Sequence, residues 1–180
     1  MNLAKILDSA LRAVGNLNLT SGALAVGSTA TNIAFGALSY LLDGIFRTKG
    51  ANAVGVAFSA GHLRVPQNYN CFFVLTADAA GNMKTYQGRL FKTEVVEGAT
   101  KYRGYDTKPI PGGTTVSVSI ASDLVDLNCA FIPDGIPLTE AVIGIAKVSP
   151  TAADFIPGTT ALTGIVTFTN TACIPDATSL

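Results

Sequence analysis

The stretch that decides the fold spans residues 141–170 and reads AVIGIAKVSPTAADFIPGTTALTGIVTFTN. Residues 141–148 and 164–169 are rich in Val, Ile and Thr, which favour strands. Pro157-Gly158 lies between them and is typical of a turn. The stretch therefore predicts two strands joined by a loop, and none of its side chains suits a catalytic mechanism.

The same strand-forming residues continue toward the N-terminus. Residues 71–77 (CFFVLTA) form an almost continuous apolar run, which predicts a central, buried strand. Asp43-Gly44 separates two β-rich runs and predicts a hairpin with a type I′ turn. Residues 78–82 (DAAGN) predict a second hairpin with a longer loop, and residues 54–58 and 116–120 predict further strands. Eight or more short strands indicate a mainly β fold, a sandwich or jelly-roll-like barrel.

Two segments give a less regular pattern. Residues 90–108 carry much of the charge, and we expect an exposed excursion there with room for one strand. Residues 124–132 fit either another strand or a short turn of helix.

The N-terminal residues 3–14 predict one amphipathic helix, with Asn2 to cap its start and Gly15 to end it. A helix of about 12 residues is marginal alone, so its apolar stripe must pack on its own domain, on sister subunits or on a larger partner. The stripe follows the i, i+3, i+4, i+7 spacing and consists of Leu3, Ile6, Leu7, Ala10, Leu11 and Val14.

At 180 residues the chain predicts one domain, or one domain with a small appendage. We place an N-terminal helix and arm at residues 1–36 and a β-sandwich domain at residues 37–180. The arm is uncharged from residue 17 to residue 35 and alternates apolar with small polar residues, so it could add a strand to a neighbour's sheet. The candidate association surface comprises Leu3, Ile6, Leu7, Leu11, Val14, Leu17 and Leu19.

The amino-acid composition limits the kinds of partner that the chain could bind. Hydrophobic residues make up 48% of the chain and charged residues 13%, against about 25% charged in an ordinary soluble domain. This deficit indicates either an unusually compact fold or burial in an assembly. The net charge of zero gives no electrostatic basis for binding nucleic acid or an anionic membrane. No apolar run of about 18 residues predicts a membrane span.

The N-terminus and the cysteines predict synthesis in a cytosol without export. Lys5, Asp8 and Arg12 interrupt any apolar signal segment. The three cysteines have no CxxC spacing, and their odd number leaves at least one unpaired, so we expect buried, reduced thiols. They are Cys71, Cys129 and Cys173.

Candidates for catalysis are few. His62 is the only histidine, and it lacks a recognisable nucleophile motif. The carboxylate pairs Glu94/Glu97 and Asp123/Asp126 are spaced three apart, which places their members on opposite faces of a strand. Asp43, Asp78 and Asp134 stand in turn sequences. We therefore expect no enzyme, no cofactor and no metal site.

Several phrases of the chain, taken in order, resemble a class of small virion proteins encoded by tailed bacteriophages. The chain departs from that pattern at residues 65–68, where a small residue and a glycine are replaced, and it inserts residues 90–108. The phrases are YLLDGIFRTK (40–49), LRVP (63–66), FVLTADAAG (73–81), IPDGIP (132–137), AVIGIAKV (141–148) and FIPGTTAL (155–162).

The resemblance implies a structural role on the virion. Such proteins are capsid decoration (cement) proteins, or head or tail fibre components, and are commonly homotrimers that bind the major capsid protein and lock neighbouring capsomers together. A fibre or baseplate component is a close variant of this expectation. A carbohydrate-binding β-sandwich module is a separate alternative, for which Tyr69, Tyr102 and Tyr105 are the candidate stacking residues. A hydrolase built on His62 is the weakest alternative.

Overall fold

A computed structural model describes residues 16–96, 99–105, 116–118, 136–137 and 139–169. Within these residues the protein is built from strands, with no helix, and every strand pair is antiparallel. The expected mainly β fold is therefore confirmed. The helix predicted for residues 3–14 lies outside the described residues.

The largest element is a six-stranded sheet in the order β10-β9-β8-β7-β11-β12. Its strand β7 has neighbours on both sides and is buried along residues 71–77, so the predicted central strand is confirmed. The strands predicted for residues 141–148 and 164–169 are β11 and β12, which pair directly. The strands are β7 (Asn70–Asp78), β8 (Met83–Val96), β9 (Ala99–Tyr105), β10 (Val116–Val118), β11 (Glu140–Val148) and β12 (Val166–Thr169).

Two three-stranded sheets precede the large sheet in the chain, in the orders β1-β4-β5 and β2-β3-β6. The chain runs through both sheets three times, as the consecutive pairs β1 and β2, β3 and β4, and β5 and β6. One strand of each pair belongs to one sheet and the other strand belongs to the second sheet. Between the two strands of a pair the chain leaves one sheet and enters the other. At this point Gly36, between β3 and β4, donates a 3.0 Å hydrogen bond from its N to the O of Gly22, between β1 and β2. The strands are β1 (Leu17–Asn18), β2 (Ala25–Val26), β3 (Ile33–Phe35), β4 (Leu38–Leu42), β5 (Ile45–Lys49) and β6 (Asn52–Val56).

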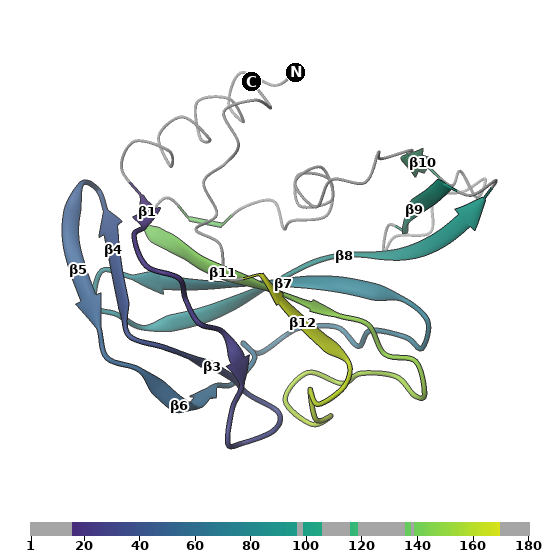
Figure 1. The fold of residues 1–180 in the computed structure, drawn as a ribbon, viewed down its shortest axis with the longest axis horizontal. Coiled ribbons are helices and arrows are strands. Elements are labelled where there is room, and N and C mark those ends of the chain that lie inside the picture. The colour runs from purple at the N-terminus through teal and green to yellow at the C-terminus, as the bar shows by residue number, and fades with distance from the viewer. Residues whose placement is uncertain (1–15, 97–98, 106–115, 119–135, 138, 170–180) are drawn as a thin grey trace.

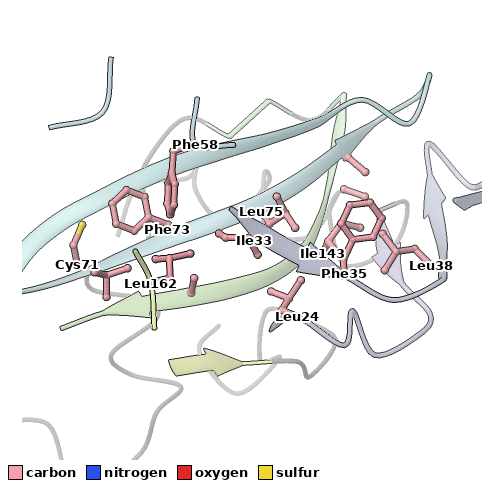
Figure 2. Packing of buried hydrophobic residues seen from close by; sticks show 14 of the residues in the cluster. Leu24, Ile33, Phe35, Leu38, Phe58, Cys71, Phe73, Leu75, Ile143 and Leu162 are labelled. Atoms are coloured by element: carbon pink, nitrogen blue, oxygen red, sulfur yellow. The ribbon is translucent and has the colours of Figure 1, made fainter. Parts of the chain in front are cut away.

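The hydrophobic core joins these small sheets to the large one. Phe58 of the loop after β6 packs edge-on against Phe73 of β7 and Phe155 of the loop after β11, at centroid distances of 4.9 and 5.5 Å. Figure 2 shows side chains from both the small sheets and the large sheet meeting in this core. Its members include Leu24, Ile33, Phe35, Leu38, Tyr40, Leu42, Cys71, Leu75, Ile143 and Leu162.

The predicted arm, where it is described, has its strand partners within this chain. Strand β1 pairs with β4, and β3 pairs with β6, so residues on both sides of the proposed boundary at 36/37 share sheets. Close backbone packing holds them together: a Cβ on Gly27 would lie only 2.3 Å from Val54 O of β6.

Both predicted hairpins are confirmed. Asp43 and Gly44 connect β4 to β5 with φ values of 53° and 72°, the two positive angles that a type I′ turn requires. Asp78 organises the turn between β7 and β8, because its Oδ1 accepts hydrogen bonds from Ala80 N at 2.9 Å and Asn82 N at 2.8 Å.

Residues 90–108, predicted as an exposed excursion with room for one strand, contribute to two strands. Residues 90–96 belong to β8 and residues 99–105 form β9, and the two strands pair in regular register. Glu94 lies opposite Lys101, so charges that suggested a loop occupy complementary register positions instead. The strand predicted at residues 116–120 is present as β10. Figure 1 shows β9, β10 and the end of β8 extending away from the β4–β5 hairpin.

Candidate association surface

Among the described residues, the outer face of the β1-β4-β5 sheet stands out because it exposes large apolar side chains. Strand β4 alternates, so that Leu38, Tyr40 and Leu42 are buried in the core and Ser39 and Leu41 face the other way. Leu41 is directly opposite Phe46 of β5, whose side chain is 60% exposed. An antiparallel sheet with one face in water normally shows polar residues on that face, so apolar residues on both faces make this sheet a candidate contact surface.

Two of the predicted association residues lie in or next to strand β1 of this sheet. Leu17 is the register partner of Leu41, and Leu19 N donates a 2.8 Å hydrogen bond to Ser39 O. The side chain of Leu19 is 49% exposed. The face therefore carries Leu19, Leu41 and Phe46, and we call these three residues the apolar outer face. The other predicted association residues, Leu3, Ile6, Leu7, Leu11 and Val14, lie outside the described residues.

Sequence reasoning missed Leu41 and Phe46 although a signal was present. Both flank the Asp43-Gly44 turn at equal distance, and a type I′ hairpin places such residues opposite each other. Counting the apolar residues on each side of the hairpin would have shown that neither face was polar.

The hairpin that carries this face is fixed to the large sheet. Tyr40 Oη donates to Asp78 O at 3.0 Å, and Arg47 Nη1 donates to Ala79 O at 2.7 Å. At its turn, Asp43 N donates to Asn16 Oδ1 at 2.9 Å. Because both strands are tied to the β7–β8 turn, the apolar outer face keeps a defined position.

A second exposed apolar patch lies on two loops joined by a backbone bridge. Val65 and Phe155 exchange two 2.9 Å hydrogen bonds, N to O in each direction. One of these loops carries Leu63, 57% exposed, and the other carries Ile156, 50% exposed. We call Leu63 and Ile156 the loop patch.

His62 lies beside this patch in a structural setting. Its Nε2 is 2.9 Å from Thr85 Oγ1, and its ring packs at 5.5 Å from the Phe73 ring. Burial lowers the pKa of His62, and Thr85 is only 2% exposed. The hydroxyl that His62 contacts is thus closed to a substrate, and among the described residues no carboxylate bonds to the imidazole.

The buried acid of the described residues is Glu140, which sequence reasoning did not single out. Thr76 Oγ1, Lys84 Nζ and Tyr86 Oη donate to its carboxylate at 2.6, 2.8 and 3.0 Å. Burial by itself would raise the pKa of Glu140, but these hydrogen bonds outweigh burial and leave the pKa lowered. The group is a satisfied carboxylate that joins β7, β8 and β11, and its oxygens are occupied.

Most of the remaining candidate residues cannot be placed by their side chains. The side chains of Glu94, Glu97, Asp123 and Asp126 lie outside the described set, as do Cys129 and Cys173. Cys71 is a free, buried thiol, and burial raises its pKa to about 12. Within the described ranges, no group of three or more His, Cys, Asp or Glu side chains could hold a metal ion. In the same ranges no helix is long and apolar enough to cross a membrane.

Of the three candidate sugar-stacking tyrosines, only the side chain of Tyr69 is described. Lys92 Nζ lies 4.8 Å from the centroid of the Tyr69 ring and occupies one of its faces. Tyr102 and Tyr105 are in β9, and only their backbone register is described, opposite Thr93 and Leu90.

Comparisons with known proteins add no relative. No family model, no curated protein and no solved structure matches the chain.

Proposed function

We propose that the chain is a non-enzymatic virion structural protein, a capsid decoration protein that forms homotrimers and binds the major capsid protein between capsomers. The observation that carries this proposal is the apolar outer face, where Leu19 is 49% exposed and Phe46 is 60% exposed. The resemblance of the sequence phrases to phage virion proteins supplies the setting. We also propose that the two small sheets and the large sheet form the two layers of a sandwich of the jelly-roll type.

The physical basis is the hydrophobic effect at a preformed surface. Burying a Leu or Phe side chain that was fully exposed contributes about 1.5–3 kcal/mol. The hairpin bonds from Tyr40 and Arg47 hold the face in place before binding, so little further ordering opposes association. A few buried anchor residues of this kind dominate the affinity of protein interfaces, and the contacts around them contribute little energy but exclude water.

The experiment is a mass measurement by light scattering followed by co-sedimentation with bare capsids of the same virus. The proposal expects a mass of three chains and a protein that pellets with the shells. The matched variant is Phe46→Ser, which removes the largest exposed side chain of the face and should lower the pelleted fraction. A monomer that stays in the supernatant with intact shells contradicts the proposal, and a glycan screen would then test the carbohydrate-binding alternative.

A further inference from the structure

Residues 59–63 (SAGHL) form a short surface segment between two residues of the hydrophobic core. Phe58 precedes the segment and Val65 follows it closely, and both are buried in the core. The five residues between them are partly or fully exposed. We call residues 59–63 the strap, because both of its ends are fixed while its middle lies on the surface.

The strap is bonded to a part of β8 that β9 does not cover. Strand β9 pairs with β8 only from Leu90 onward. Before that point, Thr85 N donates to Ser59 Oγ at 2.9 Å and Ser59 N donates to Thr85 Oγ1 at 2.8 Å. Gln87 Oε1 accepts from Leu63 N at 2.6 Å, and Gln87 Nε2 donates to Leu63 O at 2.8 Å. Each of these bonds uses a side chain at one end, so the strap closes the edge of β8 without a backbone ladder.

His62 is the residue of the strap whose charge can change near neutral pH. Its Nε2 lies 2.9 Å from Thr85 Oγ1, the same oxygen that accepts the hydrogen bond from Ser59 N. The imidazole centroid is 5.5 Å from that of the Phe73 ring and 6.3 Å from that of the Phe58 ring. A proton on this ring therefore places a positive charge against the aromatic part of the core.

The titratable side chains next to the residues that His62 contacts are uncharged or paired. Burial raises the pKa of Cys71 in β7 to about 12, so this thiol is neutral. Burial is also the main influence on His62 and lowers its pKa, while a hydrogen bond with Thr85 raises it by less. The paired groups are Arg64 with Asp154, Lys84 with Glu140 and Tyr86 with Glu140.

We propose that the strap is a proton-sensitive closure of the β8 edge: protonation of His62 loosens residues 59–63, while Phe58 and Val65 stay in the core. The loosened strap uncovers Thr85 N, which Ser59 Oγ otherwise satisfies. An uncovered strand edge is a template for pairing with another extended chain. The inference goes beyond the proposed function and does not depend on it, because neither a capsid nor a second copy takes part.

The direction of the pH dependence follows from the environment of the imidazole. The folded-state pKa of His62 lies below its ordinary value of 6.5, so the closed strap favours the neutral ring and is fully held above that value. Closure weakens as the pH falls from 6.5 to the lowered pKa and changes no further below it. Ordinary carboxyl groups titrate near pH ~4, so their effect is separated from that of His62.

The test follows the unchanged full chain by nuclear magnetic resonance between about pH 7.5 and about pH 5.5, above the range of ordinary carboxyl groups. His62 is the only histidine, so its imidazole signals need no further assignment. We expect His62 to titrate below 6.5 and the amides of Ser59, Leu63 and Thr85 to lose protection against hydrogen exchange. Each pH unit by which His62 titrates below 6.5 corresponds to about tenfold loss of protection. The amide of Leu75, in the central strand β7, should keep its protection.

The matched variant is His62→Asn, whose side chain is polar and carries no proton that titrates in this range. Its strap amides should show no fall in protection between the two pH values. A titration of His62 at or above 6.5, an unchanged protection of Ser59 and Thr85, or an equal fall in His62→Asn would each overturn the inference. The first two outcomes are measured on the unchanged protein, so they decide the question even if the variant does not fold.

Discussion

Strand β7 and the β4–β5 hairpin contain similar apolar residues but differ in how far these residues are buried. Both faces of β7 are buried along residues 71–77. The hairpin buries Leu38, Tyr40 and Leu42 on one face and leaves Phe46 largely exposed on the other. The comparison teaches that apolar residues on both faces indicate core in a central strand but leave an exposed apolar surface, a candidate for contact, in a sheet at the periphery. Two phenylalanines, Phe73 and Phe46, allow the comparison to be tested.

The largest expected effect is at the buried phenylalanine. Phe73→Ala removes a ring that is 0% exposed and packs against Phe58 and Phe155. The lost burial and the cavity should lower the free energy of unfolding by about 3–5 kcal/mol. Urea denaturation followed by circular dichroism measures it. A loss below about 1 kcal/mol would mean that the core does not depend on this aromatic cluster.

The next effect concerns the buried carboxylate that joins three strands. Glu140→Gln removes charge-assisted hydrogen bonds from Lys84, Thr76 and Tyr86, and should cost about 1–3 kcal/mol at neutral pH. Because the folded-state pKa of Glu140 lies below its ordinary value of 4.5, its stabilising contribution is complete above that value. It is lost as the pH falls through the lowered pKa.

Unfolding measured from pH 7 to pH 3 checks this sign. The pKa of Asp78 is also lowered, by its side-chain hydrogen bond with Asn82, and this carboxyl contributes in the same direction in both proteins. Because the variant lacks the contribution of Glu140, its free energy of unfolding should decline less steeply with acid than that of the unchanged protein. An equally steep decline would show that Glu140 is not the group responsible.

A smaller effect is expected at the turn that supports the exposed face. Gly44→Ala puts a Cβ on a residue with φ of 72°, and the left-handed conformation costs about 1–2 kcal/mol for a non-glycine residue. Gly50→Ala is the matched control, since a Cβ there meets nothing within 4 Å and its φ is not positive. Thermal unfolding of both variants separates the two cases, and equal melting temperatures would contradict the type I′ assignment.

The smallest effect on stability should come from the exposed phenylalanine. Phe46→Ala removes a ring that is 60% exposed, and its free energy of unfolding should change by no more than about 0.5 kcal/mol. The same urea titration as for Phe73→Ala gives the contrast directly. A loss near that of Phe73→Ala would place Phe46 in the core and remove the basis for a contact surface.

Local sequence signals predicted the elements that depend on neighbouring residues. Asp43-Gly44 set the first hairpin, and the apolar run at residues 71–77 set the central strand. The sequence predicts one strand within residues 90–108 and not the β8–β9 pair, because charge favours a loop there, whereas Glu94 and Lys101 are opposite each other in register. A charged strand and a charged loop have the same composition, and only pairing separates them.

The candidate surfaces were predicted in part for a similar reason. Leu17 and Leu19 were selected by alternation, and they lie beside Leu41 in the sheet. The loop patch depends on the bridge between Val65 and Phe155, which are distant in the chain and are flanked by no shared motif. The exposure of a residue depends on which other parts of the fold cover it. The alternation of apolar and polar residues along a strand does not give that information.

The bonds from Tyr40 and Arg47 to the carbonyl oxygens of Asp78 and Ala79 have a consequence for how this region can change over evolutionary time. The β4–β5 hairpin takes its orientation from backbone atoms of a short turn, so the identity of Ala79 matters less than the number of residues in the turn. Adding or deleting a residue there would shift the two oxygens and tilt the hairpin.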